Sequence, residues 1–278
     1  MQLGTFGVWI GRTLEEQRYG EAAALAQELG FGTLWLGGSP RLAKLRAMLE
    51  ATDRIVIATG VVNVWQYQPA GLADEFNALE EAFPGRVLLG IGIGHPEATQ
   101  EYSRPLASMG RFLDALAAAA VPVDPERMVL AALGPKMLDL SAARTLGAHP
   151  YFTPPAHTRF ARERLGQGPV LAPEQAVVVS SGDRAAALQS ARQYAGVYLG
   201  LSNYTASLER LGYSKQALAG GGSQEVVDEL VPQGSGDEVA SAVRRHLEAG
   251  ADHVCVQAVG AAGVPEREWR ELAAALIA

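Results

Sequence analysis

The strongest constraint on the fold is a regular alternation of short apolar runs with amphipathic stretches along the 278 residues. The run from Arg54 to Trp65 is rich in β-branched residues, which is typical of a strand buried on both faces of a parallel sheet. The next stretch carries Leu72, Phe76 and Leu79 at steps of four and three, which predicts an amphipathic helix. Eight strand-like runs, most of them separated by such helices, predict a (β/α)8 TIM barrel rather than an open sheet.

The expected elements can be placed along the chain. The eight predicted strands are residues 3–9, 33–36, 54–65, the run that starts at 86, 128–134, 148–153, 174–180 and 253–259. The main predicted helices are residues 14–29, 72–83, 109–120, 135–147, 154–166, 236–250 and 266–277, with others starting near 40 and 183. Residues 199–236 are less regular but too periodic for a disordered linker. We expect them to form a helical insertion over one end of a single domain that spans residues 1–278.

Composition limits the class of protein. The formal net charge of -7 argues against nucleic acid or an anionic membrane surface as the main partner. No stretch approaches the ~20 uninterrupted apolar residues of a membrane span, and the N-terminus does not resemble a signal peptide. The single cysteine, Cys255, excludes an internal disulfide and lies in an apolar run. We therefore expect a cytoplasmic protein with a small-molecule substrate, in which Cys255 is a buried hydrophobic residue rather than a nucleophile.

The most unusual stretch is RVLLGIGIGHPE, which starts at Arg86. Its apolar strand gives way to Gly90, Gly92 and Gly94 at every second position, and His95 follows directly. A strand that loses its side chains near its end lets a neighbouring element or a flat ligand approach closely. A bend at a barrel corner or tight packing remains an alternative reading of these glycines. The spacing is not the G-x-G-x-x-G fingerprint of dinucleotide-binding folds.

Several chemistries lack the residues they need. The five histidines include no His-x-His pair and no helical His-x-x-x-His pair, so we expect no metal site. The three lysines, Lys44, Lys136 and Lys215, fall in predicted helices or loops rather than on strands, which disfavours Schiff-base chemistry. Only Glu97 is placed as a glycosidase carboxylate would be, and two are needed. A site rich in glycine, aromatic and amide groups suits a bound cofactor that supplies the chemistry.

The chain resembles a known family in several segments. These are ATGVVNVW, PGRVLLGIGIGHPE, AALGPKML, HPYFTPPAHTRFARERLG, APEQAVVV, NYTASLERLGY and AGADHV. Together they resemble the luciferase-like monooxygenase superfamily, and more narrowly its actinobacterial branch of oxidoreductases that depend on the deazaflavin coenzyme F420. The resemblance implies a (β/α)8 barrel with insertions, a homodimer, and a deazaflavin ring held across the strand ends.

The resemblance also implies roles for residues near the ring. The family commonly has a non-prolyl cis peptide bond on the third strand, and Gly60–Val61 is the matching position. Asn63 would then form a hydrogen bond with the pyrimidine edge of the ring. Gly92 and Gly94 would let the ring lie against the backbone.

The proton-transfer group departs from the family pattern. His95 stands where related deazaflavin enzymes have an acidic residue, so a carboxylate mechanism does not transfer directly. We expect the imidazole of His95 to supply or remove the proton that accompanies hydride transfer, with Glu97 as a weaker candidate. The loop at 37–40 lacks the acidic residue and histidine of related glucose-6-phosphate and alcohol dehydrogenases. Their substrates therefore cannot be assigned to this chain.

The cofactor phosphate is expected at a helix start. Gly134, Pro135 and Lys136 open a predicted helix after the fifth strand, where free backbone N–H groups favour an anion. By the same resemblance, Thr153, together with His157 and Thr158 in the next helix, would complete this phosphate site or contact substrate.

Three functions remain open at this point. The leading hypothesis is an oxidoreductase that transfers a hydride between coenzyme F420 and a small organic substrate. The second keeps the fold but uses FMN, as a luciferase-like monooxygenase. The third is a non-catalytic flavin-binding barrel.

Overall fold

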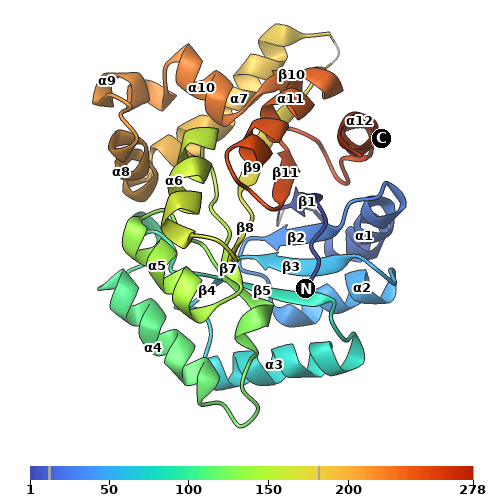
Figure 1. The fold of residues 1–278 in the computed structure, drawn as a ribbon. Helices are drawn as coiled ribbons and strands as arrows, with labels where there is room; N and C mark the ends of the chain where they lie inside the picture. Colours follow the sequence, from blue (N-terminus) through green and yellow to red (C-terminus); the bar gives the residue numbers. More distant parts are fainter. Residues whose placement is uncertain (12–13, 181, 278) are drawn as a thin grey trace.

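The computed structural model describes residues 1–11, 14–180 and 182–277, and shows parallel strands surrounded by helices (Figure 1). Every strand pairing recorded for these residues is parallel. The strands are β1 (Phe6–Ile10), β2 (Thr33–Gly37), β3 (Val56–Gly60), β4 (Val62–Asn63), β5 (Val87–Gly92), β6 (Met128–Leu130), β7 (Gly147–Ala148), β8 (Val170–Leu171), β9 (Glu174–Val179), β10 (Gln233–Gly234) and β11 (Val254–Ala258).

Helices follow most of these strands, as the alternation in the sequence predicts. The α-helices are α1 (Tyr19–Glu28), α2 (Leu45–Glu50), α3 (Pro69–Ala82), α4 (Pro105–Ala117), α5 (Pro135–Arg144), α6 (Pro155–Leu165), α7 (Arg184–Leu199), α8 (Ser202–Arg210), α9 (Lys215–Leu218), α10 (Gln224–Leu230), α11 (Gly236–Glu248) and α12 (Glu266–Leu276). Short 3-10 turns are η1 (Glu16–Arg18), η2 (Leu42–Lys44), η3 (Pro96–Ala98), η4 (Pro125–Arg127) and η5 (Ala219–Gly221).

The sheet closes through one extended segment, residues 170–179. Its first part, β8, pairs with β7, and its second part, β9, pairs with β11. Between them, the Ala172 N–H donates to the Ala148 carbonyl at 2.9 Å, and the Pro173 carbonyl accepts from the Cys255 N–H at 2.9 Å. The remaining pairs run in order from β11 through β1, β2, β3, β5 and β6 to β7. The predicted (β/α)8 barrel is therefore confirmed.

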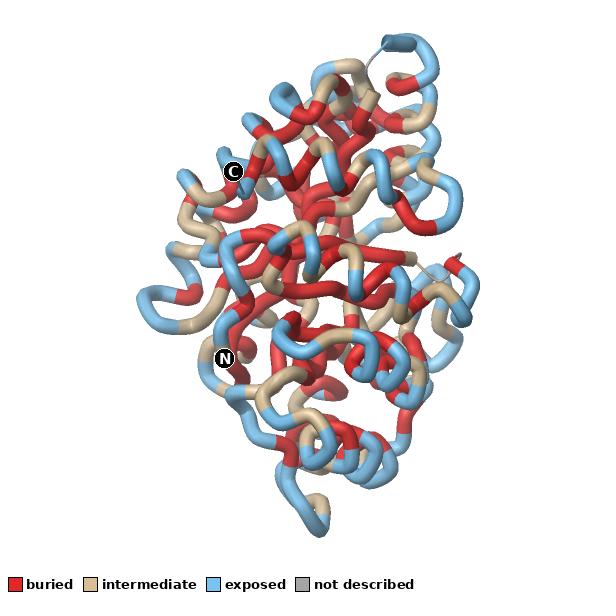
Figure 2. Tube along the Cα trace, turned by 90° about the vertical axis from the view of Figure 1, so that its right-hand side faces the viewer, coloured by how far each residue is buried: buried red, intermediate tan, exposed pale blue. Residues whose placement is uncertain are grey.

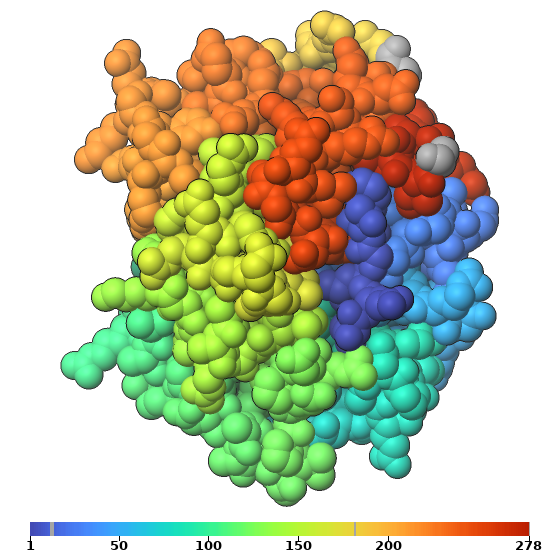
Figure 3. Space-filling model, in the orientation of Figure 1, coloured from blue at the N-terminus to red at the C-terminus, as the bar shows by residue number. Residues whose placement is uncertain are grey.

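The first strand, β1, pairs with the last strand, β11. Phe6 of β1 is in register with Val254 of β11. Figure 3 shows the result on the surface, where the N-terminal residues lie beside the segment near residue 250.

Side chains on each strand alternate between the helices and the barrel axis. On β1, Phe6 and Val8 belong to the large apolar core that the surrounding helices cover, whereas Trp9 belongs to a smaller core inside the barrel. The smaller core also holds Trp35 and Cys255, so the prediction of a buried Cys255 is confirmed. Figure 2 shows the buried chain in the middle of the molecule and the exposed residues on outer helix turns.

Two predicted strands and one predicted helix have different boundaries in the structure. The strand expected over 148–153 pairs only at Gly147–Ala148, because the chain leaves the sheet and Phe152 adopts a positive φ of 53°. The strand expected over 54–65 divides into β3 and β4 at Gly60–Val61. The helix expected from Leu14 begins at Tyr19, after a 3-10 turn.

Residues 202–230 form α8, α9 and α10, which lie alongside α7 (Figure 1). Tyr204 and Leu208 of α8 share a separate apolar core with Ala191 of α7 and Val227 of α10. After these helices, β10 pairs with the last residues of β9.

Gly90 on β5 provides a test of how closely β3 and β5 pack. A Cβ added there would lie 2.0 Å from the Thr59 carbonyl oxygen, so the backbone would have to move. We predict that Gly90→Ala lowers the free energy of unfolding by about 2–3 kcal/mol in denaturant titrations. The control is Gly110→Ala in α4, where nothing lies within 4 Å of the new Cβ, and where the change should raise stability by about 0.5–1 kcal/mol. Equal effects of the two substitutions would contradict this packing.

Candidate functional site

The carboxyl ends of the strands form a surface where inward-facing residues become accessible to solvent. Inward residues deeper in the barrel, such as Ala58 and Val129, are fully buried. Those at the strand ends are half-buried: Gly60, Val61, Ala131, Tyr151 and Gln257. Barrels of this class carry their sites at this face.

The third strand is interrupted at Gly60–Val61, where the peptide bond is cis, as predicted. The side chain of Val61 lies over β5, where a Cβ on Gly92 would come within 2.4 Å of Val61 Cγ2 and one on Gly90 within 3.1 Å of Val61 Cγ1. The space that Gly92 leaves is therefore taken by the Val61 side chain, and contact between a ring and Gly92 stays a prediction. The glycines of β5 make room for the protein's own Val61, which then faces the strand-end surface.

Gly94 has a similar explanation. Its φ is +72°, and a Cβ on it would lie 2.8 Å from Asn63 Nδ2, so the space is filled by an amide rather than left for a ligand. The Asn63 Oδ1 accepts from the Trp65 N–H at 3.1 Å, and the Asn63 N–H donates to Ser39 Oγ at 2.9 Å. These bonds fix the Asn63 side chain and leave its half-buried amide nitrogen near the strand ends.

His95 and Glu97 both contact the start of α8. His95 Nδ1 lies 3.1 Å from Asn203 Oδ1, and its ring centroid is 5.4 Å from that of Tyr204. Glu97 accepts from the Ser202 N–H at 2.9 Å, and this hydrogen bonding lowers the pKa of Glu97. Glu97 is exposed, whereas His95 is half-buried beside Tyr204 of α8.

The predicted phosphate site lies at the start of α5. Pro135 occupies the first turn, and Gly134 precedes it without a side-chain cap, so backbone N–H groups are available there. Lys136 is exposed in this turn. Thr153 is 3% exposed, and its Oγ1 has no hydrogen-bond partner among the described residues.

The two α6 residues differ from expectation. The Thr158 hydroxyl is fully buried and lies 2.7 Å from His246 Nδ1, so it joins α6 to α11 and does not reach an open site. His157 is also buried, and its Nε2 donates to the Leu133 carbonyl at 2.9 Å. Burial lowers the pKa of His157 to about 4, which leaves its Nδ1 as an acceptor. The imidazole therefore fits a phosphate only if it becomes protonated.

A tyrosine cluster that sequence reasoning missed borders this surface. It consists of Tyr151, Tyr194, Tyr198 and Tyr204. The Tyr151 hydroxyl lies 2.6 Å from that of Tyr194 and 3.1 Å from that of Tyr198, and it donates to Gln257 Oε1 at 2.8 Å. The cluster joins the end of β7 to α7 and α8. No local pattern signals it, because its members come from separate elements.

Glu174 is a buried titratable residue that the sequence analysis did not single out. It faces inward on β9 and is fully buried, with one oxygen accepting from the Phe152 N–H at 3.0 Å. Its other oxygen has no partner in the part of the chain that the structure describes. Burial raises the pKa of Glu174 to about 8, so the carboxyl group is protonated at neutral pH. The only sequence signal was an acidic residue at the start of an apolar run.

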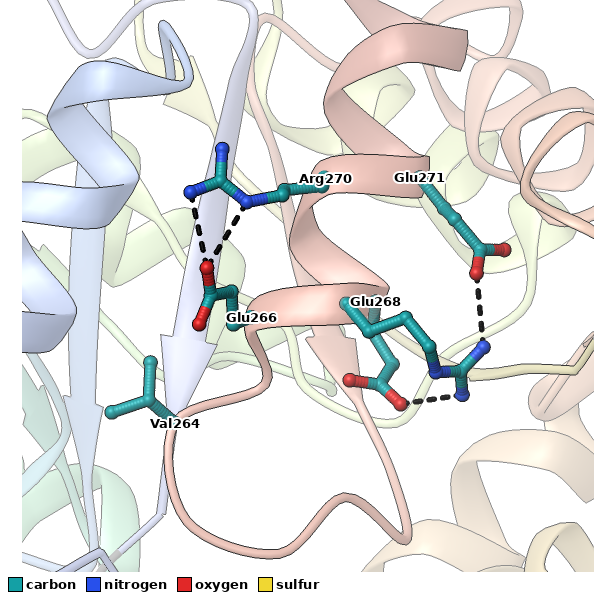
Figure 4. A pocket seen from close by; sticks show the side chains of 6 residues that line it. Val264, Glu266, Glu268, Arg270 and Glu271 are labelled. Carbon is teal, nitrogen blue, oxygen red and sulfur yellow. Dashed lines mark hydrogen bonds and ion pairs between the residues drawn. The ribbon is translucent and has the colours of Figure 1, made fainter.

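The described residues show no group of three or more His, Cys, Asp or Glu that could hold a metal. Two cavities, of about 580 and 450 Å³, lie on the outer surface around α12. In the first (Figure 4), Arg270 pairs with Glu266, and Arg267 pairs with Glu268 and Glu271. These side chains satisfy one another, and neither cavity includes a residue from the strand ends. We therefore place the candidate site at the strand ends.

The protonated Glu174 predicts a pH dependence of stability. Its folded pKa of about 8 lies above its ordinary value of 4.5, so the folded state holds a proton that the unfolded state releases. The stabilisation is complete below pH 4.5 and is lost as the pH rises through 8. Between pH 6.5 and 8, we predict that the free energy of unfolding of wild type falls by about 2 kcal/mol more than that of Glu174→Gln. Parallel curves for the two proteins in urea titrations would contradict a neutral Glu174.

Three comparisons with known proteins bear on this fold. The family model described as luciferase-like monooxygenase matches residues 5–120. An F420-dependent glucose-6-phosphate dehydrogenase of Microbacterium testaceum is 32% identical over 104 residues, which cover 29% of this chain and only 31% of that relative. A Mycobacterium tuberculosis protein, named as a coenzyme F420-dependent oxidoreductase, is 25% identical over 312 residues, which cover 89% of this chain and 86% of that protein.

A solved structure extends the match to the whole fold. An F420-dependent secondary alcohol dehydrogenase in complex with an F420-acetone adduct superimposes with a TM-score of 0.78 and 16% identity, over 99% of this chain and 98% of that one. Residues 5–120, which the family model matches, include both the Gly60–Val61 peptide bond and the glycines of β5. The resemblance of this chain to the luciferase-like monooxygenase superfamily, and to its actinobacterial F420-dependent branch, is thus confirmed.

Proposed function

We propose that this protein is an oxidoreductase that uses coenzyme F420 to transfer a hydride to or from a small organic substrate. The relative that matches 89% of the chain is named for this coenzyme. The deazaflavin supplies a ring carbon that takes or gives the hydride, and the protein supplies binding, orientation and proton transfer.

The observation that carries the proposal is the fit of the strand-end surface to a phosphate-bearing cofactor. The first turn of α5 has no side-chain cap, so the backbone N–H of Lys136 is available, and the Lys136 side chain adds a positive charge. Pro135 has no N–H, and the N–H groups of Met137 and Leu138 donate to the Gly134 carbonyl at 3.1 Å. The buried hydroxyl of Thr153, without a partner among the described residues, is a further donor. Anionic oxygens are the ligands that such a donor set prefers.

The region around β4 fits the ring of the cofactor. Val61 presents an apolar surface at the strand ends, and Gly90 and Gly92 hold it in place by leaving room for its methyl groups. The amide nitrogen of Asn63 is a donor suited to a ring carbonyl, because its Oδ1 is already engaged with Trp65.

His95 is the group we assign to proton transfer. Its Nδ1 faces Asn203, which fixes the ring plane and leaves Nε2 for the substrate. Glu97 accepts from the Ser202 N–H, so we keep it as the weaker candidate.

The proposal also includes an oligomeric state and a cellular location. A homodimer and a cytoplasmic location remain predictions. No helix among the described residues is long and apolar enough to cross a membrane.

The cofactor choice can be tested directly by titrating the purified protein with F420 and, separately, with FMN, while following cofactor fluorescence. We predict saturable binding of F420. Lys136→Ala should weaken F420 binding about 5–10-fold at low salt, because it removes a phosphate-binding charge. Lys215→Ala, an exposed lysine on α9, is the matched control and should have no effect.

Tight FMN binding without F420 binding would contradict this proposal and would indicate an FMN-dependent luciferase-like monooxygenase instead. Binding of F420 without turnover on a broad panel of alcohols, enones and imines would favour a non-catalytic barrel.

The role of His95 predicts a kinetic result. We expect His95→Gln to lower kcat by about 100-fold or more, because positioned acid-base groups contribute that much, and to change F420 affinity less than twofold. Steady-state assays with reduced or oxidised F420 measure the first quantity, and the fluorescence titration measures the second. An unchanged kcat would remove His95 from the mechanism.

A further inference from the structure

Helix α8 begins without a side-chain cap of its own. The residue before it, Leu201, has an apolar side chain that cannot accept a hydrogen bond. The first N–H group of the helix, that of Ser202, donates instead to the Glu97 carboxylate at 2.9 Å. Glu97 lies in η3 of the loop between β5 and α4, so a residue 105 positions earlier takes the place of the missing cap. The helix dipole also favours a carboxylate at this end.

The same loop contacts α8 through a second side chain, that of His95. Its Nδ1 lies 3.1 Å from Asn203 Oδ1, and its ring centroid lies 5.4 Å from that of Tyr204. The turn that carries His95 and Glu97 is closed by the Ala98 N–H, which donates to the His95 carbonyl at 3.1 Å. The two loop side chains therefore act together on the first turn of α8.

The position of Asn203 depends on how this turn is held. Its side chain forms no other hydrogen bond among the described residues. The next residue, Tyr204, is buried and packs edge-on against Phe152 and Tyr198, with ring centroids 5.6 and 5.4 Å apart. The turn is thus attached to the aromatic cluster through Tyr204 and to the β5–α4 loop through Glu97. Loss of the second attachment would leave Asn203 free to move away from the loop.

Asn203 determines which nitrogen of the neutral His95 ring carries the hydrogen. An amide oxygen can only accept, so the contact with Oδ1 requires the hydrogen on Nδ1. Nε2 is then left with a free lone pair. In this tautomer Nε2 can accept the proton that a substrate loses when its hydride passes to the deazaflavin. In the opposite tautomer, with the hydrogen on Nε2, it cannot.

We propose that Glu97 is a positioning residue: by capping α8 it keeps Asn203 against Nδ1 of His95, and so keeps Nε2 free to accept a proton. This role replaces the proton transfer considered for Glu97 above. Hydrogen bonding with Ser202 lowers the pKa of Glu97, so its carboxylate is ionised at neutral pH and remains an acceptor. The catalytic consequence rests on the proposed function, whereas the tautomer of His95 is a property of the protein without cofactor.

The test measures the tautomer of His95 from the ring nitrogen resonances of 15N-labelled protein without cofactor, at pH 8, where an ordinary imidazole is neutral. We expect Nδ1 to resonate as a protonated nitrogen and Nε2 as an unprotonated one. Two buried histidines are references in the same spectrum. His253 Nδ1 lies 2.8 Å from the Gly4 carbonyl, and His157 Nε2 lies 2.9 Å from the Leu133 carbonyl, so they hold the hydrogen on opposite nitrogens.

Variants separate the cap from the carboxylate. Asn203→Ala removes the partner of Nδ1 and should change the tautomer ratio of His95 about 5–10-fold toward Nε2–H. Glu97→Ala should shift the ratio in the same direction and speed hydrogen exchange at the Ser202 amide, whereas Glu97→Gln keeps an oxygen acceptor and should restore most of the wild-type ratio. The control is Glu101→Ala, which should leave the ratio unchanged. Glu101 is exposed in the same loop, and its side chain forms no hydrogen bond or ion pair among the described residues.

Turnover distinguishes positioning from proton transfer. We expect Glu97→Ala to lower kcat by no more than about 10-fold, following the loss of the favoured tautomer, and Glu97→Gln to recover most of that loss. If Glu97 transferred the proton itself, both variants would lose about 100-fold or more, because an amide cannot exchange a proton in this way.

Three results would overturn the inference. They are a wild-type His95 with its hydrogen on Nε2, a tautomer ratio that Glu97→Ala does not change, and equal losses of kcat in Glu97→Ala and Glu97→Gln. The first result needs no variant, so poor folding of a variant leaves the test intact. If F420 binds and the wild-type hydrogen lies on Nε2, the inference fails alone. If F420 does not bind but the tautomer responds as expected, the proposed function fails and the control of His95 by Glu97 stands.

Discussion

The closure of the barrel depends on one segment that forms strand pairs with neighbours on both sides. Residues 170–179 pair with β7 through β8 and with β11 through β9, which closes the parallel sheet into a ring. In a closed ring, alternate side chains of every strand lie either toward the helices or on the axis. The inward residues at the carboxyl ends then face one another, although they come from opposite ends of the chain. Trp9 and Tyr151 meet in this way, with ring centroids 5.7 Å apart.

The sequence predicts the parts of the fold that local patterns encode. The strand and helix alternation, the stripe of Leu72, Phe76 and Leu79, and the burial of Cys255 all follow from periodicity and composition, and the structure confirms them. The spacing of Gly90, Gly92 and Gly94 indicates that another group lies close to the backbone. It does not indicate whether that group is a ligand or, as here, the Thr59 carbonyl and the side chains of Val61 and Asn63.

The rest of the site could not be predicted because it depends on contacts distant in sequence. The hydroxyl of Tyr151 meets Tyr194, Tyr198 and Gln257 only after α7 folds onto the barrel. Thr158 follows a helix start and looked available for a phosphate, yet His246 of α11 occupies its hydroxyl. Buried polar atoms without a hydrogen-bond partner cannot be predicted from the sequence either. They are recognised only when the positions of all neighbouring groups are known.

The central claim is that a deazaflavin binds at the carboxyl ends of the strands, with its phosphate at the start of α5. A crystal structure of the protein grown with F420 tests this claim most directly. The account predicts ring density beside Val61 and Asn63, and phosphate density within hydrogen-bonding distance of the first turn of α5 and the Thr153 hydroxyl. F420 density in the surface cavities around α12, with the strand ends filled by the protein's own side chains, would contradict it.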